Sequence, residues 1–252
     1  MKQTFFYALF FTFLGISIFS STLSFAQQNS KQDKNTQDVP YNYKEAGRLF
    51  VKNYSPKEYN ASTQNWAIEQ DKNGVIYVGN TTHLLSFDGK TWERIKIGGS
   101  GVVRSLGYSS SSDRMYIGGV GDLGYSYIDS LGRTKYISLF NQIPKKYRTF
   151  TDIWKTVVLG DEVFFLTKDF ILKYSRNKFN VIQPRAHTFL SAFVVNERLY
   201  VQESKLGIFE YKNDFLNSIE KTDFIYDKLI VGMEHYSENV VLIATQNGEF
   251  YT

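Results

Sequence analysis

The feature that most constrains the fold is a degenerate repeat that begins near Asn65 and recurs to the end of the chain. Each copy reads as an apolar run, a polar turn, a strand ending in a small residue, a short loop, and a strand ending in an aromatic residue. The copies span Asn65–Trp92, Val103–Leu139, Ile153–Ile182, Leu190–Phe215 and Leu229–Thr252. A repeat of about 40–50 residues made of four short strands is typical of a β-propeller blade.

The repeat spacing predicts an all-β fold, a partial β-propeller of about four and a half four-stranded blades within residues 46–252. The second strands are expected to start 39, 48, 36 and 42 residues apart, at Ile76, Met115, Val163, Leu199 and Val241. The blades are expected at about residues 65–97, 103–139, 153–184, 190–221 and 229–252. Helical periodicity is weak, although residues 214–228 could carry a helical turn.

The fifth copy stops after its third strand, so the propeller is expected to be incomplete. Propellers close with whole blades, and an open sheet edge tends to pair with other chains. We therefore expect that Thr252 is not the natural end of a functional unit and that the isolated chain associates with itself. The alternative is a small propeller closed by a strand at Arg48–Lys52.

The N-terminus predicts export. Lys2 precedes an apolar stretch at Phe5–Phe19, and Ser24-Phe25-Ala26 forms a small-x-small cleavage site, which together indicate a signal peptide over residues 1–26. An uncleaved membrane anchor is the alternative. Residues 27–45 hold little that is apolar and are expected to be a flexible linker. The protein is therefore expected to be periplasmic or otherwise extracytoplasmic, with membrane association only through segments outside this sequence.

Charge and cysteine content exclude several classes of function. The chain contains no cysteine, which excludes disulfides and a lipid-modified cysteine. The net charge of +4 is spread along the chain without a basic cluster, so we expect no binding of nucleic acid.

The first repeat resembles the two-component regulator propeller repeat found in sensors of Bacteroidetes-type bacteria. The resemblance is specific over Asn53–Trp92 and moderate over Val103–Leu139, whereas later copies keep only the hydrophobic skeleton. His83 departs from the pattern, which usually has glycine there. The matching motif positions, expected to be structural, are Trp66, Ile68, Asp71, Gly74, Tyr77, Val78, Gly79, Leu84, Phe87, Asp88 and Gly89.

The resemblance implies the ligand-sensing portion of a two-component-type receptor. Family members continue into further blades, often a triple-tyrosine domain, a transmembrane helix and an output module such as a histidine kinase, a cyclase, a phosphatase or a DNA-binding domain. The C-terminal blades and the output module are therefore expected partners that lie outside this sequence.

No motif predicts catalysis, a cofactor or a metal. The segment Gly119–Gly124 matches G-x-G-x-x-G, but a strand rather than a helix is expected after it, so we interpret it as a blade loop. Asp71 begins a hairpin turn rather than a calcium loop, since no bidentate acid follows at the twelfth position. Asp88 is expected to be a turn residue whose carboxylate bonds to nearby backbone N–H groups. The three histidines, at positions 83, 187 and 235, are isolated in sequence and give no zinc-ligand spacing.

Ligands of propellers bind at one mouth of the central channel, and the chain offers three candidate residues there. Arg104, Trp154 and Arg185 lie near blade starts, and such side chains would suit a carbohydrate or a carboxylate. The alternative is that they only pack between blades or remain solvated. The loops expected at this mouth are Asn80–His83, Gly118–Asp122, Thr167–Phe170 and Gln202–Lys205.

The leading hypothesis is an extracytoplasmic sensor that binds an unidentified small molecule, glycan or protein and is not itself an enzyme. A secreted scaffold for protein or glycan binding is the first alternative. A propeller enzyme is the second, and it should show clusters of acidic residues or histidines at equivalent blade positions, which the sequence does not reveal.

Overall fold

The computed structural model describes residues 51–252. The predicted signal peptide at residues 1–26 and the predicted linker at residues 27–45 lie outside the described part. Of the strand considered at Arg48–Lys52 as a closing element, only Val51 and Lys52 are described, and both are irregular.

The first sheet follows a short helix. The helix α2 (Pro56–Tyr59) begins after Ser55, whose backbone N–H donates to the Glu58 carboxylate at 2.6 Å, and proline stands in its first turn. The antiparallel sheet then runs β1 (Asn65–Gln70), β2 (Ile76–Asn80), β3 (Leu84–Phe87) and β4 (Trp92–Ile95) in that order.

The later sheets repeat this meander. The second contains β5 (Val103–Ser109), β6 (Arg114–Gly119), β7 (Leu123–Ile128) and β8 (Thr134–Ser138). The third contains β9 (Lys155–Leu159), β10 (Glu162–Leu166), β11 (Ile171–Ser175) and β12 (Lys178–Ile182). The fourth contains β13 (Phe189–Val195), β14 (Arg198–Glu203), β15 (Gly207–Lys212) and β16 (Phe215–Ser218), and the last contains β17 (Ile230–Ser237), β18 (Val240–Thr245) and β19 (Phe250–Tyr251).

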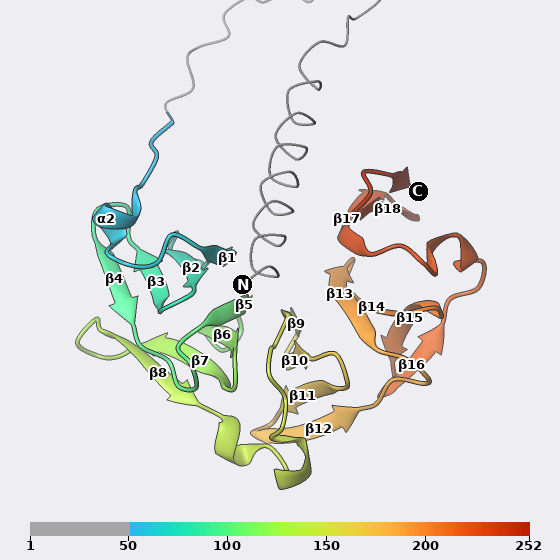
Figure 1. The fold of residues 1–252 in the computed structure, drawn as a ribbon, viewed down its shortest axis with the longest axis horizontal. Helices are drawn as coiled ribbons and strands as arrows, with labels where there is room; N and C mark the ends of the chain where they lie inside the picture. Colours follow the sequence, from blue (N-terminus) through green and yellow to red (C-terminus); the bar gives the residue numbers. More distant parts are fainter. Residues whose placement is uncertain (1–50) are drawn as a thin grey trace, which may run out of the picture. The chain divides into compact units, whose positions relative to one another are not determined.

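The predicted fold class is confirmed, because the described residues form four four-stranded antiparallel sheets and one three-stranded sheet. Within Lys52–Thr252 the sheets follow one another around an arc, with β1, β5, β9, β13 and β17 on its inner side (Figure 1). Each second strand begins at, or one residue before, the start predicted from the repeat. The ambiguous stretch at residues 214–228 contains β16 and a short 3-10 helix at Asp223–Ile225.

The predicted turn residues of the first repeat act as turns. The Asp71 carboxylate accepts the backbone N–H groups of Asn73 and Val75 at 2.9 and 3.0 Å. The Asp88 carboxylate accepts those of Lys90 and Thr91 at 2.8 and 2.6 Å. Gly74 and Gly89, also in these turns, adopt φ of +83° and +92°, which glycine reaches without steric cost.

Apolar side chains fill the space between successive sheets. The cluster between the first two sheets includes Tyr77, Leu84 and Met115, and Tyr116 and Phe165 pack between the second and third. Gly79 allows close approach here, because a Cβ at that position would lie 2.9 Å from Cγ1 of Val103. Burial of this apolar surface, rather than bonding within each sheet, joins the blades.

A buried cation also joins the third and fourth sheets. The Lys173 ammonium on β11 donates to Glu162 and Tyr211 at 2.9 Å each, and to Asp214. Burial alone would lower the pKa of Lys173, but the hydrogen bonds that it donates to Asp214, Tyr211 and Glu162 raise it. Lys173 therefore remains charged between the sheets, its charge balanced by the two carboxylates.

Candidate ligand-binding site at the channel mouth

A cavity of about 580 Å³ lies on the inner side of the arc, lined by the innermost strand of every sheet. Because residues from five separate repeats meet there, no single stretch of sequence reveals it. The cavity is lined by residues that include Trp66, Arg104, Trp154, Phe193, Met233 and Glu234.

Two tryptophans flank one arginine at the end where the innermost strands start. The Arg104 guanidinium carbon lies 3.7 Å from the ring centroid of Trp66 and 5.1 Å from that of Trp154. Trp66 is 39% exposed and Trp154 is 47% exposed, so both rings also face open space. We call these three residues the mouth trio. Such cation–π contacts stabilise the arginine over the rings.

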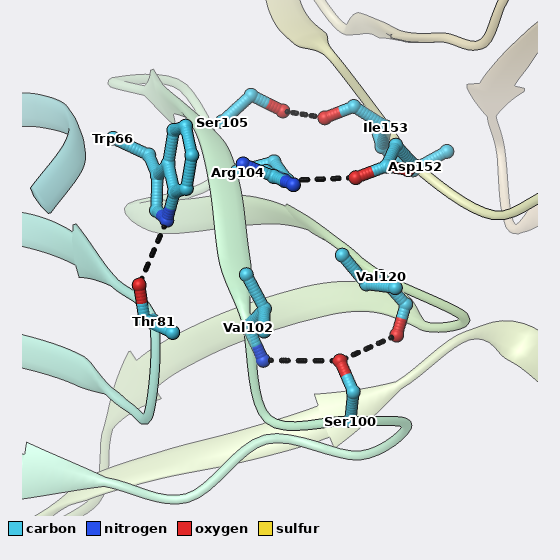
Figure 2. A network of polar contacts seen from close by, with 9 residues as sticks. All are labelled: Trp66, Thr81, Ser100, Val102, Arg104, Ser105, Val120, Asp152 and Ile153. Atoms are coloured by element: carbon cyan, nitrogen blue, oxygen red, sulfur yellow. Dashed lines mark hydrogen bonds and ion pairs between the residues drawn. The ribbon is translucent and has the colours of Figure 1, made fainter. Parts of the chain in front are cut away.

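Hydrogen bonds within the first repeat and between the second and third repeats hold the surroundings of the mouth trio in place, and Figure 2 shows those of Trp66 and Arg104. Arg104 Nε donates to Asp152 Oδ1 at 2.8 Å, and the indole N–H of Trp66 donates to Thr81 Oγ1 at 3.1 Å. Asp152 is itself held by a β-bridge to Val120. The hydroxyl of Ser105 donates to the Ile153 carbonyl at 2.8 Å, which ties the segment before Trp154 to β5. The site is therefore organised before any ligand arrives.

The guanidinium keeps unused hydrogen-bonding capacity. Arginine has five N–H donors, and among the described residues only Nε of Arg104 has a hydrogen-bond partner. Nη1 is buried without an acceptor. An unsatisfied buried donor costs about 1–3 kcal/mol, so an acceptor that reached this nitrogen would recover that energy.

Charged side chains also line the channel beyond the mouth trio. Lys155 is the first residue of β9, and Glu69 and Glu234 lie on β1 and β17. Burial lowers the pKa of Lys155, while Glu69 and Glu234 act in the opposite direction. Together with the Arg104–Asp152 pair, the channel carries nearly balanced charge and does not attract anions strongly as a whole.

The third predicted mouth residue, Arg185, does not join the trio. Its guanidinium lies 4.9 Å from the Phe209 ring centroid and donates to the Leu216 carbonyl at 2.8 Å. Its backbone N–H donates to the carboxylate of Glu203 at 2.9 Å. Arg185 thus packs against its own blade, whereas Trp66, which the motif placed among structural positions, contributes to the site.

The predicted mouth loops lie at the same end of the sheets as the trio. The end of each second strand pairs with the start of the innermost strand, as in Asn65 with Asn80 and Phe189 with Glu203. Gly119–Gly124 contains such a loop, since it joins the end of β6 at Gly119 to the start of β7 at Leu123. His83 stands where the repeat motif usually has glycine. Its φ is not positive, so the histidine causes no backbone strain there.

Sequence reasoning missed the buried polar residues that hold these loops. Asn80 is fully buried and donates to Ser62 and Asn65 at 2.7 Å each, while the Thr167 hydroxyl donates to the Phe170 carbonyl at 2.6 Å. Asn80, Thr167, Glu203 and Thr245 end or directly follow the second strands of four different sheets. Aligning the strand ends, rather than the hydrophobic cores, would have shown this recurring polar position.

Within residues 51–252, no group of three or more histidine, cysteine, aspartate or glutamate side chains is placed to hold a metal ion. No helix in that range combines the length and apolar character needed to cross a membrane.

The sequence matches no model of a known protein family and no curated protein. Solved structures do resemble it. The WD40 propeller domain of Doa1 gives a TM-score of 0.56 at 12% identity, with 75% of this chain and 64% of that chain covered. Virginiamycin B lyase from Staphylococcus aureus gives 0.52 at 11% identity, covering 75% and 69%.

A sensor domain is also among the similar structures. The extracellular domain of BT4673 from B. thetaiotaomicron, described as a one-component or a hybrid two-component system, gives a TM-score of 0.51 at 14% identity. The match covers 76% of this chain but only 28% of that one. At these identities the likeness shows the fold alone, and that fold is the β-propeller.

Proposed function

We propose that this chain is the ligand-recognition portion of an extracytoplasmic sensor in a two-component-type signalling receptor. The observation that carries the proposal is the mouth trio, in which two partly exposed indoles flank an arginine at the entrance of a cavity of about 580 Å³. Concave sites with aromatic walls and a few convergent polar groups are typical of ligand binding.

The extracytoplasmic setting has two supports. Residues 1–26 have the sequence features of a signal peptide, and the similar structures include the extracellular domain of BT4673. The motif over Asn53–Trp92 further favours a receptor of this kind over a free-standing scaffold. The output module belongs to segments outside this sequence.

The chemistry of the trio favours a small ligand with a flat apolar face and several hydroxyl groups, such as a sugar. An exposed indole offers a stacking surface. Because Asp152 already neutralises Arg104, the pair supplies donors and acceptors to hydroxyls rather than a free positive charge. A carboxylate ligand would instead have to compete with Asp152.

Signalling would follow from differential affinity. A ligand shifts a receptor between two states only by the difference in its affinity for them. The trio draws on three repeats, since Trp66, Arg104 and Trp154 precede or lie on β1, β5 and β9. Ligand binding there would therefore favour one relative placement of the first three blades.

Binding to an array of glycans and small carboxylates tests the proposal. We expect saturable binding of a sugar, weakened at least about tenfold by Trp154→Ala, because about 1.4 kcal/mol of stacking and desolvation energy would be lost. Trp92→Phe is the matched control. Trp92 lies on the outermost strand β4 of the first sheet, where its ring stacks on Phe87 with 4.6 Å between the ring centroids. Binding of proteins only would favour the scaffold, and turnover of an arrayed sugar would favour an enzyme.

A further inference from the structure

A second, smaller cavity lies at the opposite end of the sheets from the mouth trio. Its volume is about 140 Å³, and it is formed by the turn after β5, the turn after β9 and the turn after β11. The innermost strand β5 starts at the mouth with Val103 and ends here with Ser109. The cavity is therefore separate from the channel mouth.

The lining of this cavity is rich in hydrogen-bond donors. We call the following six residues the basic pocket: Ser109, Ser111, Ser112, Arg114, Arg176 and Asn177.

The two arginines of the basic pocket are not neutralised by ion pairs. Within residues 51–252, neither Arg114 nor Arg176 has a carboxylate oxygen within 4.0 Å, whereas Arg104, Arg133 and Arg198 each do. Asp161 also lines the cavity, and its carboxylate accepts the Ser111 hydroxyl at 2.8 Å. Two cations and one anion leave a net positive charge.

Packing against tyrosines fixes the position of the pocket. The Arg114 guanidinium carbon lies 4.2 Å from the ring centroid of Tyr125. The Tyr174 hydroxyl donates to Asn177 Oδ1 at 3.0 Å, which leaves the amide hydrogens of Asn177 as donors. Arg176 and Asn177 form the turn itself, with φ of +50° and +59°.

The serine hydroxyls can turn toward a bound anion. The Ser109 and Ser111 hydroxyl oxygens lie 3.2 Å apart, and the backbone N–H of Ser112 donates to Ser109 Oγ at 3.4 Å. These two bonds are long, so the Ser109 hydroxyl gives up little when it donates to a better acceptor, whereas the Ser111 hydroxyl is already held by Asp161.

We propose that the basic pocket binds a tetrahedral oxyanion, a sulfate or phosphate group, either free or as a monoester on a larger ligand. Guanidinium groups bind such oxygens through paired N–H donors, and serine and asparagine side chains complete the shell. The cavity of about 140 Å³ has room for one such group. This site is independent of ligand binding at the channel mouth.

Calorimetric titration tests the site with four probes: inorganic sulfate, inorganic phosphate, glucose 6-sulfate and glucose 6-phosphate, at constant ionic strength set with chloride. We expect at least one probe to bind saturably. Arg176→Gln should weaken that binding at least about tenfold, which corresponds to about 1.4 kcal/mol. Arg176 is exposed in a turn, so this substitution leaves the fold intact, and Arg114→Gln provides a second test.

The control is Arg133→Gln, which removes the same charge from a 59% exposed side chain on another hairpin. It should leave the affinity unchanged. Equal affinities for a free ion and its monoester would identify the free ion as the ligand, and tighter binding of the monoester would identify a larger molecule. Absence of saturable binding by all four probes, or equal weakening by Arg133→Gln and Arg176→Gln, would overturn the proposal.

Discussion

Replacing Glu203 by glutamine should destabilise the protein although it changes one atom. Glu203 ends β14 and is fully buried. Its carboxylate accepts three backbone N–H groups, from Arg185 at 2.9 Å, Ala186 at 2.7 Å and His187 at 2.8 Å. Among residues 51–252 no cationic side chain lies within 4.0 Å of it. Backbone dipoles alone therefore compensate its burial.

The magnitude follows from the donors that glutamine cannot satisfy. The amide oxygen can retain two of the three bonds, those from Ala186 and His187, but the NH₂ group then faces the N–H of Arg185. An unpaired buried donor costs about 1–3 kcal/mol, and bonds to a charged acceptor are stronger than bonds to a neutral one. The expected loss for Glu203→Gln is about 2–4 kcal/mol, and Glu203→Ala should cost more because it unpairs all three.

Urea denaturation measures this loss. With a slope of about 1–3 kcal/mol per molar urea, the midpoint of Glu203→Gln should fall by at least about 0.7 M. Glu197→Gln is the matched control, since Glu197 is exposed in the preceding turn and carries the same charge. Its effect should stay within about 0.5 kcal/mol. If both variants unfold at the same urea concentration, the reasoning about buried backbone donors is wrong.

Three further predictions concern packing, pH and self-association. Gly98→Ala would place a Cβ 2.3 Å from Asp122 Oδ2 and should cost about 1–3 kcal/mol in urea unfolding, whereas Gly232→Ala, with its nearest neighbour at 3.7 Å, should be nearly neutral. Hydrogen bonds from the backbone N–H groups of Thr91 and Lys90 lower the pKa of Asp88 in the folded protein. Asp88→Ala should therefore be less stable than the wild type above pH ~4, and the two stabilities should become equal once the pH falls below the folded-state pKa. The protein should self-associate in sedimentation velocity, because an open sheet edge tends to pair with another chain. Val231→Lys should reduce the self-association, since Val231 lies on the last sheet and is 55% exposed. A monodisperse wild-type monomer would refute this prediction.

The sheets could be predicted from sequence because their signals are local. The apolar runs that form strands, and turn residues such as Asp71 and Gly74, determine the backbone conformation of only a few neighbouring residues. The repeat therefore predicted four complete sheets and a final one with three strands, as the structure has them. Even the weak fourth and fifth copies kept enough apolar periodicity to locate β14 and β18.

The site could be predicted only in part because it depends on distant contacts. Arg104 pairs with Asp152, 48 residues further along the chain. Arg104 and Trp154 were both expected at the mouth, and both line the cavity in the structure. Trp66 was expected to be a structural residue of the repeat motif, but it lines the same cavity. Arg185 does not line this cavity, and its backbone N–H is bound by Glu203, a residue with no local signal.

The most direct test of ligand recognition at the channel mouth uses intrinsic fluorescence. The chain has three tryptophans, and two of them belong to the mouth trio. In Trp92→Phe, which also removes a buried indole N–H without an acceptor, all tryptophan emission comes from Trp66 and Trp154. Titration with a sugar that binds in calorimetry should change this emission saturably, with the same midpoint. Saturable calorimetric binding with unchanged emission would contradict recognition at the mouth.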